Sequence, residues 1–152
     1  MHFTHPFDPL DPFRFQHQLS DKEKTVQQHA AHFASAHLSP IVTDHFRHER
    51  DPRQLITAMG QAHLFGGDIP TTSGGPAHTA TEYGLINREI ERIDSGFRTL
   101  QSVMSALVMH AIHAFGSEQQ RKTYLPALAR GEIVGSFALT EPEHGSDPAS
   151  LS

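Results

Sequence analysis

The sequence predicts a mostly α-helical fold, a bundle of about six helices that ends in the first strand of a β domain. Three observations support this fold class. Apolar residues repeat at helical spacing along most of the chain, as in the stripe over 83–93. β-type sequence begins only at Ile133. Helix-start signals, in which Ser or Thr stands three residues before Glu or Gln, occur at Ser20–Glu23, Thr79–Glu82 and Ser117–Gln120.

The first three helices are expected before residue 64. The first begins at the Ser20 capping box and ends near His37, because Ser39-Pro40 stops it. A second begins near Pro40. A third begins at Asp51-Pro52, where a capping oxygen precedes a proline, and runs to about His63.

Three more helices follow a loop over residues 64–76 that is rich in Gly, Pro, Thr and Ser. The helix that starts at Thr79 is expected to end at Gly96. Residues 97–115 are apolar on most sides, which is typical of a helix at the centre of a bundle. The last helix starts at Ser117 and is expected to close at Leu125-Pro126.

This order predicts an extended N-terminal arm at residues 1–18, a helical domain at 19–131 and the start of a β domain at 132–152. A single strand cannot satisfy its own backbone groups, and even an isolated hairpin is marginal. We therefore expect the chain to be truncated at the point where a sheet domain begins.

Composition narrows the possible functions. The chain has 152 residues and a net charge of −5, so it can form one domain and lacks the basic surface of a nucleic-acid binder. It contains no Cys, which excludes disulfides and thiolate chemistry. No apolar run could span a bilayer, and the N-terminus carries no secretion or transit signal. We expect a cytoplasmic protein without membrane insertion.

Histidine pairs at helical spacing do not predict a metal site. A pair three residues apart could share a metal ion, but no motif supplies a third ligand. We interpret these histidines as surface or packing residues and expect no metal. The pairs are His29 and His32, His45 and His48, and His110 and His113.

The C-terminal segment carries the strongest functional signal. An apolar strand breaks at Thr140-Glu-Pro142 into a polar turn, and such a turn offers hydroxyls and unpaired backbone N–H groups to a ligand. The string FALTEPEHGSDPASL resembles the flavin-binding segment of the acyl-CoA dehydrogenases. The stretch from Tyr83 to Glu132 resembles their helical region. The resemblance is closest to the glutaryl-CoA dehydrogenase branch, on ERIDSGFR, SALVMH and FGSEQQRKTYLPALARGE.

The resemblance implies an FAD site at the start of the family's middle β domain. There the Thr140 hydroxyl would bond the flavin near N5, and the amides around Leu139 would reach its pyrimidine edge. Such donors stabilise the charge that develops on a reduced flavin. The implied cofactor-binding residues are Phe137, Ala138, Leu139, Thr140, Glu141, Pro142, Gly145 and Ser146.

The resemblance also implies a substrate site. Ser146 would contact the acyl-CoA, while Glu91, Arg98 and Thr99 match residues around the distal carboxylate of the glutaryl substrate. A guanidinium suits this role because its fork can hold a carboxylate bidentately. The residue types alone favour another interpretation, a solvated arginine at a helix start for Arg98 and an ion pair on an exposed helix face for Glu91.

Three departures from the glutaryl branch bear on the substrate. Thr99 stands where a serine is usual, and it keeps the hydroxyl. Ala111 replaces a common proline, and Glu143-His144 replaces a pair that usually contains Asn.

The implied activity is α,β-dehydrogenation of an acyl-CoA, glutaryl-CoA by closest resemblance, followed in that branch by decarboxylation to crotonyl-CoA. The family's base lies in a C-terminal domain, so we assign no catalytic residue here and expect this chain to be inactive alone. The family implies a homotetramer and an electron-transfer flavoprotein as electron acceptor. The alternative is a non-catalytic truncated product, or a helical interaction module that pairs with a separate second half.

Overall fold

The computed structural model describes residues 9 and 11–151. Half of the predicted N-terminal arm, residues 1–8 and 10, lies outside these residues, and its described part contains a 3₁₀ turn at Phe15–His17. The proposed domain boundaries remain predictions.

The described chain is helical and, over these residues, contains no β-strand. Helices α5 and α6 are joined by a π-helical segment into one continuous run, called here the central helix, so the α-helices form six rods as the sequence predicts. The elements are α1 (Asp21–Phe33), a π-helical turn (Ala34–Leu38), α2 (Val42–His48), α3 (Arg53–Gln61), α4 (Ala80–Glu91), α5 (Ser95–Ser102), the π-helical segment (Val103–Met109), α6 (His110–Phe115) and α7 (Glu118–Ala129).

Local sequence fixes where several helices begin. All three predicted capping boxes form, with the side chains of Ser20, Thr79 and Ser117 each accepting a hydrogen bond from the backbone N–H three residues later. Before α3, Asp51 Oδ1 accepts from the Arg53 N–H at 2.9 Å.

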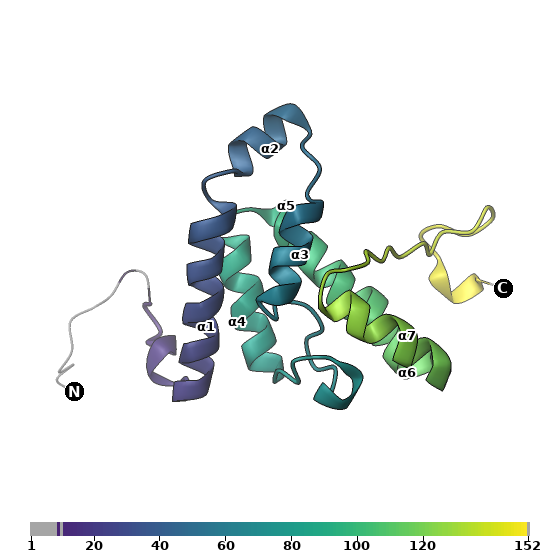
Figure 1. The fold of residues 1–152 in the computed structure, drawn as a ribbon, viewed down its shortest axis with the longest axis horizontal. Helices are drawn as coiled ribbons and strands as arrows, with labels where there is room; N and C mark the ends of the chain where they lie inside the picture. The colour runs from purple at the N-terminus through teal and green to yellow at the C-terminus, as the bar shows by residue number, and fades with distance from the viewer. Residues whose placement is uncertain (1–8, 10, 152) are drawn as a thin grey trace.

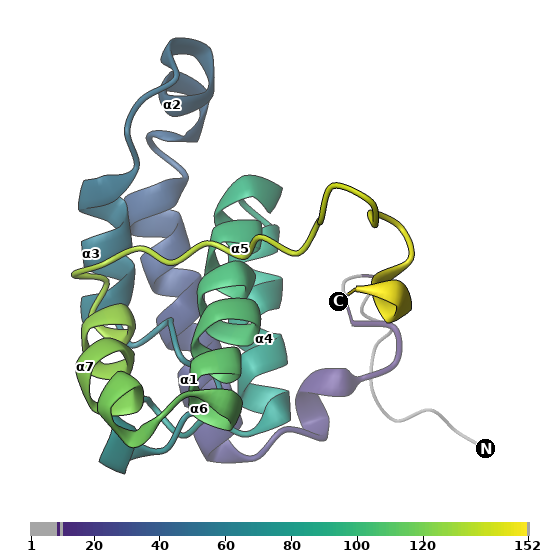
Figure 2. The same cartoon turned by 90° about the vertical axis from the view of Figure 1, so that its right-hand side faces the viewer.

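The core lies where α1, α3 and α4 stand side by side against the central helix, while α2 projects beyond one end of the bundle (Figures 1 and 2). Side chains from every rod except α2 become fully buried there. The largest include Phe65, Leu38, Met59, Ile86, Ile90, Met104 and Leu125.

Two predicted helix ends were wrong. Helix α4 ends at Glu91 rather than at Gly96, because Asp94 Oδ1 accepts from the Phe97 N–H at 2.9 Å and starts α5, which contains Gly96. Helix α7 continues through Pro126 to Ala129. Leu125 and Leu128, on either side of that proline, are buried, so packing outweighs the lost backbone hydrogen bond.

Glycines allow α3 to cross closely over the end of α7. A Cβ added at Gly60 would lie 2.2 Å from the backbone carbonyl carbon of Arg130. Gly131 follows α7 with φ +67, and its carbonyl accepts from Thr57 Oγ1 at 3.2 Å. Backbone meets backbone here with no room for a side chain.

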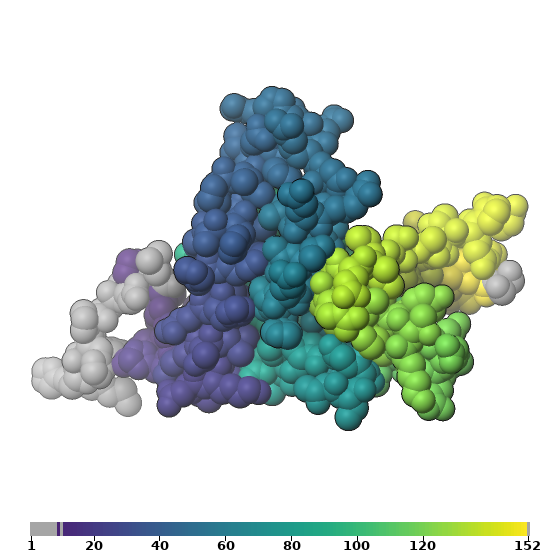
Figure 3. Space-filling view, in the orientation of Figure 1, coloured from purple at the N-terminus to yellow at the C-terminus, as the bar shows by residue number. Residues whose placement is uncertain are grey.

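The segment predicted as a strand runs extended and without a ladder partner in the described part of the chain. At its start it lies against the central helix: the Gly135 N–H donates to Met104 Sδ at 3.2 Å, and a Cβ on Gly135 would meet Val108 Cγ1 at 2.4 Å. Beyond Gly135 the chain projects from the body of the molecule (Figure 3). A strand could form there only with a partner outside the described residues.

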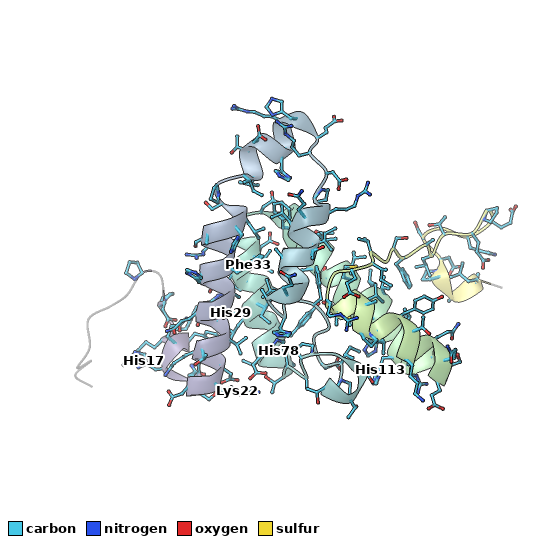
Figure 4. All side chains as sticks on the ribbon, viewed as in Figure 1. His17, Lys22, His29, Phe33, His78 and His113 are labelled. Carbon is cyan, nitrogen blue, oxygen red and sulfur yellow. The ribbon has the colours of Figure 1, made fainter. Side chains whose placement is uncertain are left out.

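A buried carboxylate ties α1 to the start of α4. Glu82 is only 1% exposed and accepts from Lys22 Nζ at 2.8 Å and from the Thr79 N–H at 2.8 Å. His78 Nδ1 lies 3.5 Å from Oε2 of Glu82 (Figure 4 labels Lys22 and His78). The hydrogen bond from Lys22, aided by the one from Thr79, lowers the pKa of Glu82 against the opposing effect of burial.

Glu82→Gln is expected to weaken the dependence of the free energy of unfolding on pH in the acidic range. Because the folded-state pKa lies below the ordinary 4.5, the carboxylate's contribution is complete above pH 4.5 and is lost as pH falls through the folded pKa. Glutamine keeps the cap but cannot titrate, so up to about 1.4 kcal/mol per pH unit of slope should disappear. Urea unfolding at pH 7, 5, 4 and 3 measures the difference, and parallel profiles for the two proteins would refute it.

Candidate functional site

The first part of the site is an ion pair at the junction between the end of α4 and the beginning of the central helix. Arg98 Nε donates to Glu91 Oε2 at 2.7 Å, and both side chains are partly exposed. Ser95 Oγ donates to the other oxygen, Glu91 Oε1, at 2.5 Å. The hydrogen bond from Ser95, followed by the one from Arg98, lowers the pKa of Glu91 and keeps it ionised.

Thr99 and Ser102 lie on α5 next to this pair. Ser102 Oγ accepts from Arg98 Nη1 at 3.3 Å and donates to the Thr99 carbonyl at 3.1 Å. Of the three residues predicted for the substrate carboxylate, the structure joins the side chains of Glu91 and Arg98, while Thr99 takes part only through its backbone carbonyl. The structure adds Ser95 and Ser102, which sequence reasoning missed although each stands four residues after its partner.

The pair can do two kinds of work. As it stands, it joins the end of α4 to α5. Arginine has five N–H donors, and Glu91 and Ser102 use two of them, which leaves donors for a second anion. Glu91, but not Arg98, also lines a cavity of about 870 Å³ formed by α1, α4 and the segment before α1.

The second part of the site is the projecting segment from Phe137 to Ser146. Within the described residues, the backbone N–H groups of 137–140 and the Thr140 hydroxyl form no hydrogen bond. A tight turn follows, in which the Glu141 N–H donates to the His144 carbonyl at 2.9 Å and the His144 N–H donates back at 3.2 Å. Pro142 lies within this turn. Gly145 and Ser146 follow the turn, and both are exposed to solvent.

The residues whose backbone N–H groups form no hydrogen bond also have exposed side chains. Phe137 and Leu139 are 48% and 46% exposed, and Ala138 and Thr140 are also exposed. The segment thus offers apolar surface together with a row of amides and one hydroxyl. That combination suits a flat heteroaromatic ligand with acceptor atoms along one edge.

Both parts of the site depend on the central helix. The projecting segment is anchored at Met104, and Arg98 precedes Met104 by six residues, which is about 9 Å along a helix axis. In Figure 2 the chain that leads from α7 into the segment passes in front of the helices, and its far end turns away from them. One rigid element therefore sets the relation between the ion pair and the start of the segment.

Neither a metal site nor a membrane-spanning helix is found among the described residues. In the described part of the chain, no group of three or more His, Cys, Asp or Glu side chains could hold a metal ion. None of the described helices is both long and apolar enough to cross a membrane.

Comparisons with known proteins show which family the helical part of the chain resembles. Residues 20–132 match the family model described as acyl-CoA dehydrogenase, N-terminal domain. A crystal structure of a glutaryl-CoA dehydrogenase from Mycobacterium smegmatis in complex with FADH2 is similar at TM-score 0.89 and 34% identity, over 96% of this chain and 38% of that one.

Curated relatives point the same way but differ in substrate. An acyl-CoA dehydrogenase of Bacillus subtilis is 33% identical over 133 residues, covering 88% of this chain and 35% of its own length. The mitochondrial isovaleryl-CoA dehydrogenase of Bos taurus is 30% identical over 135 residues, covering 88% of this chain and 32% of its own length. The chain spans about a third of the length of these relatives. It belongs to the acyl-CoA dehydrogenase family, whose N-terminal helical domain it contains.

Proposed function

We propose that this chain provides the N-terminal part of an FAD-dependent acyl-CoA dehydrogenase of the glutaryl-CoA type. The complete enzyme oxidises the α,β bond of the thioester, and loss of the distal carboxylate as CO2 then gives crotonyl-CoA. The observation that carries the substrate assignment is the Glu91–Arg98 pair, because it leaves guanidinium donors available to a second carboxylate.

The residues of the projecting segment fit FAD. The cofactor accepts hydride from the substrate when it is bound. Phe137 and Leu139 supply apolar contact, while the amides near Leu139 and the Thr140 hydroxyl supply donors that no other described group occupies. Glu141 and Pro142 form the turn that ends this row, and Gly145 and Ser146 follow it toward the acyl-CoA.

The substrate assignment competes with other acyl-CoA esters. Short-chain and isovaleryl-CoA dehydrogenases are also similar to this chain, and neither name specifies a substrate with a distal carboxylate. An uncharged acyl group would leave the Arg98 donors without an anion. We prefer glutaryl-CoA as the substrate because its distal carboxylate would accept hydrogen bonds from these Arg98 donors.

Thr140→Val is expected to weaken FAD retention or shift the flavin's reduction potential in the complete enzyme. The change keeps the shape of the side chain and removes one hydroxyl donor, which is worth about 0.5–1.5 kcal/mol. Flavin content after purification and potentiometric titration measure the effect, and Thr140→Ser is the matched control that keeps the hydroxyl. Wild-type content and potential in the valine variant would remove Thr140 from the site.

The remaining assignments follow from the family. We propose that the complete enzyme is a homotetramer located in the cytoplasm, and that an electron-transfer flavoprotein reoxidises it. We also propose that this chain is inactive alone, because the family's catalytic base lies in a C-terminal domain. The second candidate, a helical module that pairs with a separate second half, is favoured by the extended residues 137–140, whose backbone forms no hydrogen bond within the described part of the chain. Co-purification with a separately encoded β domain would distinguish it.

A further inference from the structure

We propose that Ser95 and Ser102 are positioning residues that hold the Arg98 guanidinium with its outer edge free for a substrate carboxylate. The inference rests on the proposed function, and it assigns the specificity of the site to two hydroxyls in addition to the arginine.

Ser95 limits how Glu91 holds the arginine. A carboxylate beside a guanidinium can bind it through both oxygens at once. Here Ser95 Oγ donates to Oε1 at 2.5 Å, so Glu91 meets Arg98 through Oε2 alone, at Nε and 2.7 Å. If Ser95 were absent, Oε1 would be free to turn onto the guanidinium and take up a further N–H.

Ser102 fixes the plane of the guanidinium. A serine hydroxyl has one proton, and Ser102 donates it to the Thr99 carbonyl at 3.1 Å. Toward Arg98 the hydroxyl can therefore only accept, and it accepts from Nη1 at 3.3 Å. The four-residue spacing on α5 places the two side chains on one face of the helix.

Because Glu91 and Ser102 both hold the planar guanidinium of Arg98, the N–H groups that stay available to a ligand have a fixed direction. Nε and Nη1 each have one fixed partner, so the guanidinium cannot rotate freely about its stem. Three of its five N–H groups remain, and the side chain is 36% exposed, so they can be reached. The arginine is ordered before a ligand arrives, which reduces the entropy that a carboxylate must overcome on binding.

The test compares glutaryl-CoA with butyryl-CoA in the complete, FAD-loaded enzyme. Ser102→Ala and Ser95→Ala are each expected to raise KM for glutaryl-CoA by roughly 2- to 10-fold, with kcat changed much less. KM for butyryl-CoA should change less than that for glutaryl-CoA, because butyryl-CoA has no distal carboxylate. Ser102→Thr keeps the hydroxyl and should restore the wild-type KM.

Ser35→Ala is the matched control, because Ser35 is an exposed serine of the π-helical turn after α1 and its side chain makes no hydrogen bond in the described structure. Equal changes in KM for both substrates, or no rescue by Ser102→Thr, would overturn the positioning role. If Arg98→Met distinguishes the two substrates but the serine variants do not, this inference fails and the glutaryl assignment stands. If Arg98→Met does not distinguish them, the glutaryl assignment itself fails.

Discussion

Replacing Arg98 with methionine is expected to lower kcat/KM for glutaryl-CoA by roughly 10- to 150-fold in the complete enzyme, and to change kcat/KM for butyryl-CoA far less. A charge-assisted hydrogen bond contributes about 1.5–3 kcal/mol, which corresponds to that range of rates. The fold should survive the change, because Glu91 is 45% exposed and keeps its hydrogen bond from Ser95.

The measurement is steady-state turnover of both esters, with CO2 and crotonyl-CoA as products of the first. Arg92→Met is the matched control: Arg92 pairs with Glu89 at 3.3 Å, only six residues from Arg98, and the proposal gives it no substrate contact. Comparable losses on both esters would reject the glutaryl assignment and leave the family assignment unaffected.

Gly60→Ala is expected to destabilise the chain by about 3 kcal/mol, near the upper end of overpacking costs. The added methyl group would lie 2.2 Å from the Arg130 carbonyl carbon and 2.5 Å from the Gly131 nitrogen. Both are backbone atoms, so no side-chain rotation can relieve the overlap, and α3 would have to separate from the end of α7.

The same substitution elsewhere should have the opposite sign. Gly84 lies within α4, and a Cβ built there meets nothing within 4 Å. Gly84→Ala should therefore stabilise the chain by about 0.5–1 kcal/mol, since alanine is the better helix former. Urea unfolding followed by circular dichroism at 222 nm compares the two variants, and equal effects would show that α3 and α7 are not in close contact.

Features that depend on local sequence were predictable, and features that depend on distant residues were not. The capping boxes at Ser20, Thr79 and Ser117 are complete within four residues, and all three form. The end of α7 depended on the burial of Leu125 and Leu128 by other helices, so Pro126 was read as a stop.

The candidate site divides in the same way. Glu91 and Arg98 could be singled out through the family resemblance, because the string around them is distinctive. Ser95 and Ser102 could not. Ser95 reaches Glu91 only because the turn at 92–94 brings the end of α4 to the beginning of α5, and Ser102 matters only once Glu91 holds Arg98 across that turn. Residues 133–139 were predicted as a strand from their apolar side chains, but a strand also needs a partner.

The extended segment after Gly135 makes the bundle prone to self-association. Within the described residues, the backbone of 137–140 forms no hydrogen bond along either edge, and Phe137 and Leu139 are about half exposed. An edge of this kind is a template for any other extended chain, including another copy of itself. Pro142, which has an acidic residue on each side, follows the free edge and interrupts it, as gatekeeper residues do beside aggregation-prone strands.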